Sequence, residues 1–333
     1  MVEKQPLITT VIPTYRRPFF LKKAIMSALN QTFSNIQVIV YDNCSADQTK
    51  EEVEEIAKQD SRLKYHCHSH LIPAAENYRF AFSMVNTPFF SVLADDDLLL
   101  PYFFEIALSV LERFPAAYFF LGSTLDCSEK GKIISAEALK WTQEYFDPPS
   151  GVFEVIQKYF NWTGSLFKKE VLAQVHIDSS IKPIDLDFVI RLAAKFPFAI
   201  SKQPCARFTI HSASYSSLSG LKLFWPSWPK ITQNALDALT PFPAIQTEVR
   251  TLMKHKLKNN LFRLTINLIA QKHFVEAEKV IKVYKSEFKN DKTVFFLKMF
   301  LSILKYCSFL TMFVLLALKV YRIYQHRKIS RYY

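Results

Sequence analysis

Hydrophobic and polar positions along the first hundred residues predict strands and helices in turn. Four short segments have the length and the residue types of strands, and they are residues 7–15, 36–42, 62–68 and 89–94. The segments between them repeat apolar side chains at helical spacing, at residues 20–33, 45–59 and 74–85. Because strands that alternate with helices pair in parallel, the pattern predicts a doubly wound α/β sheet.

The pattern loosens after Gly122 and becomes largely helical towards the C-terminus. Residues 140–151 are polar and read as a loop, whereas residues 185–196 have the period of a helix. We therefore predict three parts, namely an α/β domain over residues 1–220, a helical extension over 221–290, and a hydrophobic, basic tail over 291–333.

Composition places this chain among packed globular proteins of a reducing compartment. Half of the 333 residues are hydrophobic and only five are glycine, so a sizeable core is expected. The five cysteines are scattered and show no C-x-x-C spacing, which argues against a zinc site and favours free thiols. Glu3 and Pro6 interrupt the start, where a signal peptide would need a continuous apolar run.

The net charge of +12 is concentrated in the tail. No acidic residue follows Asp291, and eight Lys or Arg residues lie in the last 42 positions. Lys305 is the one charged residue within residues 299–318, so an anionic membrane surface is favoured over nucleic acid as the partner. We expect a monotopic or re-entrant anchor rather than a single C-terminal span, on the cytoplasmic face of a membrane.

Three consecutive aspartates, Asp95, Asp96 and Asp97, end the fourth predicted strand. Asp42 ends the second, so these carboxylates are expected at one edge of the sheet. Hard oxygen ligands suit Mg²⁺ or Mn²⁺ bound to a diphosphate. The alternative is an acidic turn that caps the next helix. The sequence contains neither G-x-G-x-x-G nor a P-loop, which excludes the glycine-based nucleotide cradles.

Four segments resemble, in order and spacing, the family 2 glycosyltransferases of GT-A fold. They are VIPTYRRPFFLKKAIMSALNQTF, IQVIVYDNCSADQT, AAENYRFAFSMVNTPFFSVLADDDLLLP and IDLDFVIRLA, within residues 7–216. The resemblance implies a Rossmann-like, mostly parallel central sheet flanked by helices, here with a helical C-terminal extension. It also implies an inverting transfer of sugar from a nucleotide-diphospho-sugar, taken as a UDP-sugar, to a hydroxyl of a glycan or lipid-linked acceptor, with Mn²⁺ or Mg²⁺ as cofactor.

The same resemblance implies roles for individual residues. Asp185 takes the position of the catalytic base, with Asp187 as the runner-up. Asp97 is the favoured metal ligand, with Asp95 and His211 as the others. Trp162 is the candidate acceptor platform, although core packing is an open alternative. The nucleotide-sugar contacts are expected from Pro13, Tyr15, Arg17, Asp42, Asn77, Asp95 and Asp96.

Departures from the family pattern keep two other functions open. Ile184 stands where the family often has an acidic residue, Ile72 where it usually has Gly, and Arg16 where it usually has Asn. A catalytically silent scaffold of the same fold is the first alternative, and a sugar-nucleotide nucleotidyltransferase is the second. The second would need a glycine-rich loop after the first strand, which PTYRRP does not provide.

Overall fold

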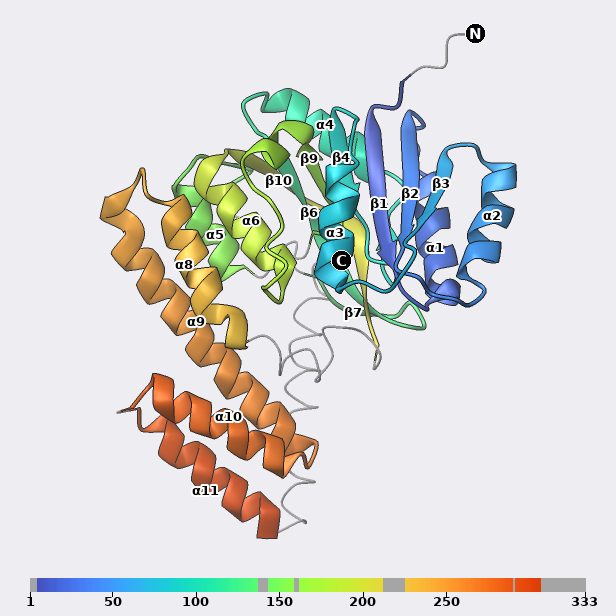
Figure 1. Cartoon of the computed structure of the whole chain (residues 1–333). Helices are drawn as coiled ribbons and strands as arrows, with labels where there is room; N and C mark the ends of the chain where they lie inside the picture. The colour runs from blue at the N-terminus through green and yellow to red at the C-terminus, as the bar shows by residue number, and fades with distance from the viewer. Residues whose placement is uncertain (1–4, 137–142, 159–161, 212–224, 290, 307–333) are drawn as a thin grey trace. The chain divides into compact units, whose positions relative to one another are not determined.

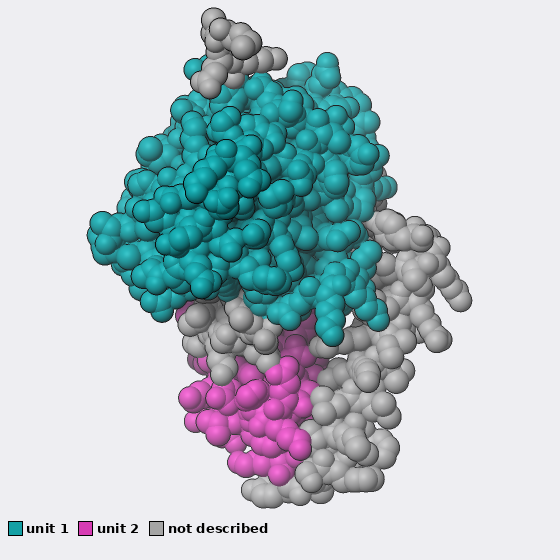
Figure 2. Space-filling view, turned by 90° about the vertical axis from the view of Figure 1, so that its right-hand side faces the viewer, with its two compact units in different colours: residues 1–214, 229–246 teal, residues 215–228, 247–333 magenta. Residues whose placement is uncertain are grey.

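The computed structural model describes residues 5–136, 143–158, 162–211, 225–289 and 291–306. The chain divides into two compact units, which are coloured separately in Figure 2. Unit 1 comprises Met1–Ser214 and Pro229–Gln246, and unit 2 comprises Tyr215–Trp228 and Thr247–Tyr333. The predicted three-part division of the chain stays a prediction.

A mixed, mostly parallel sheet forms the centre of unit 1 (Figure 1). The strands that the structure describes are β1 (Ile8–Thr14), β2 (Ile36–Asp42), β3 (Leu63–Cys67), β4 (Phe89–Val92), β5 (Leu98–Leu99), β6 (Phe119–Ser128), β7 (Ile133–Ala136), β8 (Tyr145–Phe146), β9 (Ser165–Lys168) and β10 (Phe198–Ile210). Their order is β3-β2-β1-β4-β9-β6-β10-β5, with β7 on β6 and β8 on β10. The first four strands pair in parallel, as the alternating pattern predicted.

Helices flank this sheet in unit 1 (Figure 1). They are α1 (Pro18–Leu29), α2 (Thr49–Gln59), α3 (Ala74–Ser83), α4 (Phe103–Arg113), α5 (Ser150–Gln157), α6 (Ile184–Lys195) and α8 (Trp228–Ala238). Pro18 opens α1, where its missing N–H costs no hydrogen bond. The predicted α/β fold with flanking helices is confirmed.

Strand β8 lies inside the stretch that the sequence predicted as a loop. Phe146 of β8 is buried and its ring stacks on Phe198, with centroids 5.1 Å apart. Residues 145–146 pair with the start of β10. A two-residue strand is too short to show a period in the sequence, so the polar neighbours dominated the pattern.

Register brings the functional positions of unit 1 together. Thr14 pairs with Asp42 across β1 and β2, and Asp42 pairs with Cys67 across β2 and β3. On the other side, Val11 pairs with Val92 of β4, three residues before Asp95. The carboxyl ends of four parallel strands therefore meet at one edge, which is where open α/β sheets bind ligands.

Unit 2 contains the helices α9 (Pro243–Ala270, from Thr247 onward), α10 (Phe274–Glu287) and α11 (Thr293–Tyr306). Helices α10 and α11 pack on each other through buried apolar faces. None of the helices in the described ranges is long and apolar enough to cross a membrane. The predicted membrane segment beyond residue 306 lies outside the described residues.

Candidate functional site

The aspartate triplet lies at the carboxyl end of β4, beside the ends of β1 and β10. The Thr14 hydroxyl donates a 2.8 Å hydrogen bond to Asp95 Oδ2. Arg17 Nη1 lies 3.1 Å from Asp95 Oδ1 and 2.8 Å from Asp96 Oδ2, so one guanidinium bridges two carboxylates. Burial raises the pKa of Asp95 to about 6, although Arg17 acts in the opposite direction.

Asp97 is held by two protein donors in the interior. Its side chain is buried, the Thr163 hydroxyl donates to Oδ2 at 2.7 Å, and the Thr209 N–H donates to Oδ1 at 2.8 Å. Burial and the neighbouring Asp96 charge raise its pKa well above the usual range. A metal-ligand role for Asp97 stays a prediction, and in this geometry the carboxylate ties β10 to the end of β4.

Asp96 and His211 lie in contact beside the triplet. His211 Nε2 lies 2.9 Å from Asp96 Oδ2, and the imidazole stacks on Phe20 with ring centroids 4.8 Å apart. A carboxylate and an imidazole are ligands that Mn²⁺ accepts. The described residues include no group of three acidic, histidine or cysteine side chains arranged around one point. Two protein ligands still fit an ion that takes its other ligands from a diphosphate and water.

Asp42 organises the loop that follows β2. Its Oδ1 accepts hydrogen bonds from the backbone and the hydroxyl of Ser45, and its Oδ2 accepts one from the Tyr65 hydroxyl at 2.7 Å. Asp42 and Ser45 are buried, and Tyr65 is partly exposed. The predicted contact of Asp42 with a base or ribose stays a prediction.

Three non-glycine residues at this edge adopt the left-handed backbone conformation. Arg16, Cys44 and Ala46 have φ of 53°, 59° and 50°. The Arg16 N–H donates to Ser45 Oγ at 2.8 Å, and Arg16 Nε donates to the Ser45 carbonyl at 3.1 Å. These bonds connect the loop after β1 to the loop after β2. Strain of this kind, kept in place by the surrounding bonds, clusters at ligand sites.

The remaining predicted donor contacts come from β1, from the loop that follows it and from α3. Pro13 is buried within β1, whereas Tyr15 is 37% exposed with the Arg16 guanidinium 5.2 Å from its ring centre. Asn77, on α3, donates to the Tyr41 carbonyl at 2.9 Å and lies 2.9 Å from His68 Nε2. Asn77 therefore connects α3 to the carboxyl end of β2.

Residues 66–70, with the sequence HCHSH, are not arranged as a metal centre. His66 and His68 pack against the ring of Phe80, with centroids 4.8 and 4.9 Å apart. His70 is exposed beyond the end of β3. The ring contacts of His66 and His68 therefore belong to the packing of β3 against α3.

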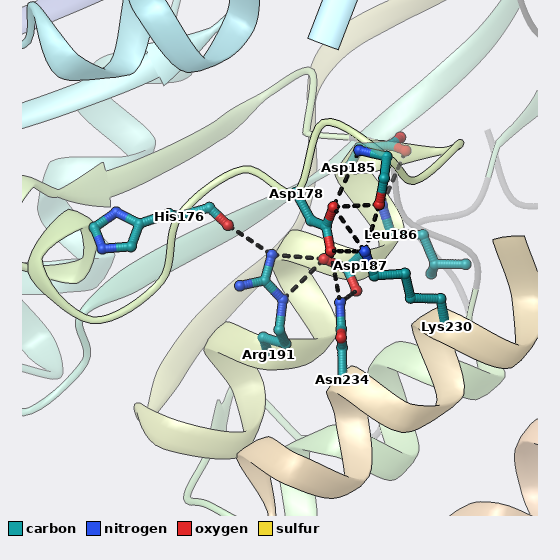
Figure 3. Close-up of polar contacts among 9 residues, drawn as sticks. His176, Asp178, Asp185, Leu186, Asp187, Arg191, Lys230 and Asn234 are labelled. Atoms are coloured by element: carbon teal, nitrogen blue, oxygen red, sulfur yellow. Dashed lines mark hydrogen bonds and ion pairs between the residues drawn. The ribbon is translucent and has the colours of Figure 1, made fainter. Parts of the chain in front are cut away.

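Asp185 lies in the first turn of α6 (Figure 3). Its Oδ1 accepts the Leu186 N–H at 2.9 Å, and no ion pair involves this carboxylate within the part of the chain that the structure describes. Burial raises its pKa to about 6. A carboxylate with this pKa can take a proton and return it near neutral pH, as a general base must.

Asp187, two residues after Asp185, is held by hydrogen bonds within the protein. It is 1% exposed, accepts a 2.8 Å bond from Arg191 Nε and a 2.9 Å bond from Asn234 Nδ2 of α8. Arg191 also donates to the His176 carbonyl at 2.7 Å (Figure 3). The general-base role of Asp187 stays a prediction, and these contacts favour Asp185.

A second set of contacts fixes α8 beside the start of α6. Lys230 Nζ lies 3.0 Å from Asp178 Oδ2, as Figure 3 shows next to the Asp187 contacts. Although burial opposes it, hydrogen bonds from Ser180, Lys230 and Asn234 lower the pKa of Asp178 to about 2. Asn234 donates to both Asp178 and Asp187, so one connected set of polar contacts holds α8 beside the start of α6.

Trp162 belongs to an aromatic cluster of the core. It is 5% exposed, and its ring lies 4.9 Å from that of Tyr78, 5.8 Å from Phe82 and 6.4 Å from Phe188. The core-packing alternative therefore describes this residue, because little of the ring is left for stacking on a sugar. The acceptor contact of Trp162 stays a prediction without support from these neighbours.

Tyr78 is a site residue that the sequence reasoning missed. Burial raises the pKa of its phenol, and the charges of Asp95, Asp96 and Asp185 raise it further. The phenol is therefore close to both the aspartate triplet and the candidate base. Its place next to Asn77 on the helix before the triplet was the available signal.

A known protein family matches the part of the chain that contains the aspartate triplet. The model of the family described as Glycosyl transferase family 2 matches residues 9–174, which run from the second residue of β1 through β9 and include the aspartate triplet. The chain belongs to glycosyl transferase family 2. The predicted family is therefore confirmed.

Two curated relatives share part of the family 2 region. A GalNAc(5)-diNAcBac-PP-undecaprenol beta-1,3-glucosyltransferase of Campylobacter jejuni is 34% identical over 96 residues, or 28% of this chain and 31% of that protein. An uncharacterized glycosyltransferase of Haemophilus influenzae is 26% identical over 112 residues, or 34% of this chain and 35% of that protein. The matches thus span about a third of each relative.

Solved structures of low sequence identity share the fold of this family 2 member. S. aureus TarS 1-349 aligns with a TM-score of 0.52 at 14% identity and covers 85% of this chain and 90% of that one. Mannosyltransferase PcManGT from Pyrobaculum calidifontis, in complex with GDP-Man and Mn²⁺, aligns with a TM-score of 0.53 at 13% identity and covers 92% and 88%. These matches confirm the GT-A fold.

Proposed function

We propose that the chain is an inverting glycosyltransferase that moves a sugar from a nucleotide-diphospho-sugar, with UDP-sugars the first candidates, to a hydroxyl of a glycan or lipid-linked acceptor. The observation that carries this proposal is Asp185, which has no ion-pair partner among the residues that the structure describes and whose charge acts on the same phenol, Tyr78, as the charges of the aspartate triplet. A base and a donor site that both lie near Tyr78 are close enough to take part in the same sugar transfer.

In the proposed step, Asp185 removes the proton of the acceptor hydroxyl. The acceptor oxygen forms a bond to the anomeric carbon while the bond from that carbon to the diphosphate oxygen breaks. The nucleoside diphosphate leaves with the electron pair, and the configuration at the anomeric carbon inverts. General-base assistance of this kind contributes about 10² to 10⁴ in rate.

The residues around the triplet would hold the donor. Asp96 and His211 are the ligands that we assign to Mn²⁺ or Mg²⁺, which when bound would neutralise charge on the diphosphate. Arg17 sets the positions of Asp95 and Asp96. Tyr15, partly exposed at the same edge, is available to the nucleoside.

The acceptor class follows from the name of one relative. The Campylobacter relative is named for a PP-undecaprenol substrate. A lipid-linked acceptor is therefore the first to test, ahead of a free glycan.

The proposal is tested by incubating the purified protein with a panel of nucleotide sugars, with and without Mn²⁺, and measuring release of nucleoside diphosphate. We expect release from one donor that needs the metal and is lost in the D185N variant. Release from none of the donors, with lipid-linked and free acceptors both supplied, would favour the silent scaffold.

A further inference from the structure

Helix α11 of unit 2 has two apolar stripes on opposite sides. The first contains Val294, Leu297, Leu301 and Leu304, which are all buried. At about 100° per residue these four fall within roughly a quarter of the helix circumference. They pack with the buried face of α10, so this stripe accounts for the helical hairpin.

The second stripe of α11 is exposed. Phe295 is 68% exposed and Phe296 is 59% exposed, and Met299 and Ile303 are exposed as well. At about 100° per residue these four also lie within roughly a quarter of the circumference, on the side opposite the first stripe. Soluble proteins rarely leave a contiguous row of large apolar side chains in water without a partner.

Charge around the stripe indicates what the partner is. Lys298 and Lys305 are exposed on α11, with Lys305 3.3 Å from Glu278 Oε1 of α10, and residues 292–333 contain no acidic residue. Residues 247–306 hold thirteen Lys or Arg and five Asp or Glu. A helix with large apolar side chains next to lysines is the pattern of helices that lie in the interface of an anionic membrane.

The sequence beyond α11 continues the same character. Residues 308–318 are uncharged and mostly aliphatic or aromatic, and residues 319–331 add five basic residues. We infer that the exposed stripe of α11, defined by Phe295, Phe296, Met299 and Ile303, docks on the surface of a bilayer that contains anionic phospholipid. This inference places the chain at a membrane and does not depend on the proposed transfer reaction.

The inference is tested by vesicle flotation of the full-length protein. Vesicles of phosphatidylcholine alone are compared with vesicles that also contain phosphatidylglycerol. The test variant replaces Phe295 and Phe296 by Ser. The matched control replaces Phe262 and Val275 by Ser, since both are exposed apolar residues of unit 2 outside α11. Circular dichroism establishes that each variant keeps its helices.

We expect the wild type and the matched control to float with the anionic vesicles and much less with neutral ones. The F295S/F296S variant should bind at least about tenfold more weakly, because two aromatic anchors are lost. K298E should weaken binding to the anionic vesicles and leave binding to the neutral vesicles unchanged.

Unchanged binding of F295S/F296S would overturn the inference and assign the membrane affinity to residues after 306. No binding of the wild type would overturn it as well. If light scattering shows instead a dimer that F295S/F296S dissociates, with no vesicle binding, the stripe is an interface between two copies of the chain and the inference is wrong.

Discussion

Replacing Asp185 by Asn separates the function of this residue from its effect on stability. The pKa of Asp185 rises from 3.8 to about 6 because the carboxyl group is buried. Ionisation of this carboxyl group therefore costs more free energy in the folded protein than in the unfolded chain. That cost is small below the unfolded pKa, grows as the pH rises towards 6, and is complete above it.

The magnitude follows from the two pKa values. A difference from 3.8 to about 6 corresponds to about 3 kcal/mol at pH 7.5 and to about 1 kcal/mol at pH 4.5. Asn carries no charge, and its side-chain oxygen can still accept the Leu186 N–H. D185N should therefore be more stable than the wild type, by up to about 3 kcal/mol at pH 7.5 and by less at pH 4.5.

The same substitution should remove most of the activity. Loss of a general base lowers the rate by about 10² to 10⁴. In the wild type, a base with a pKa of about 6 is about one-tenth ionised at pH 5, so the rate there should be about a tenth of the plateau. The assays are urea unfolding at the two pH values and nucleoside diphosphate release from pH 4.5 to 8.

Two results would refute this reasoning. Equal stability of D185N and wild type at pH 7.5 would mean that the carboxyl carries no desolvation cost. An inflection near pH 6 that survives in the residual activity of D185N would belong to another group, and Asp95 is the first candidate, since burial raises its pKa to about 6 as well.

Three further substitutions test separate parts of the site. D187N, the neighbour control on the same helix, should lower the free energy of unfolding by about 3 kcal/mol, because Arg191 loses its buried partner; urea unfolding measures this, and an unchanged midpoint contradicts it. H211A should raise the Mn²⁺ concentration for half-maximal activity by about tenfold or more, since a ligand is lost, and an identical Mn²⁺ titration curve would assign the metal elsewhere. C44N should stabilise the protein by up to about 1 kcal/mol, because Asn tolerates the φ of 59° better than Cys. Thermal unfolding measures this, and a melting temperature below that of the wild type contradicts it.

Much of the fold was readable from local pattern. Strands β1 to β4 and the helices between them carry their own periodicity, and the parallel pairing follows from their order in the chain. The positions of Asp42 and Asp95 at one sheet edge follow from the same reasoning, because Asp42 ends β2 and Asp95 comes three residues after the end of β4. Strand β8 was missed because two residues carry no period.

The sequence by itself thus determined the family, the sheet edge and the identity of the acidic residues. Only the tertiary structure decided which partner each carboxylate has. His211 reaches Asp96 from 115 positions away, Thr209 reaches Asp97 from 112, and Asn234 reaches Asp187 from the far side of a long connection. Whether an aspartate is a ligand, a base or an anchor depends on such contacts, because burial and neighbouring charges set its pKa and its free lone pairs. Local sequence encodes strands and helices, but it does not encode which distant side chains those elements bring together.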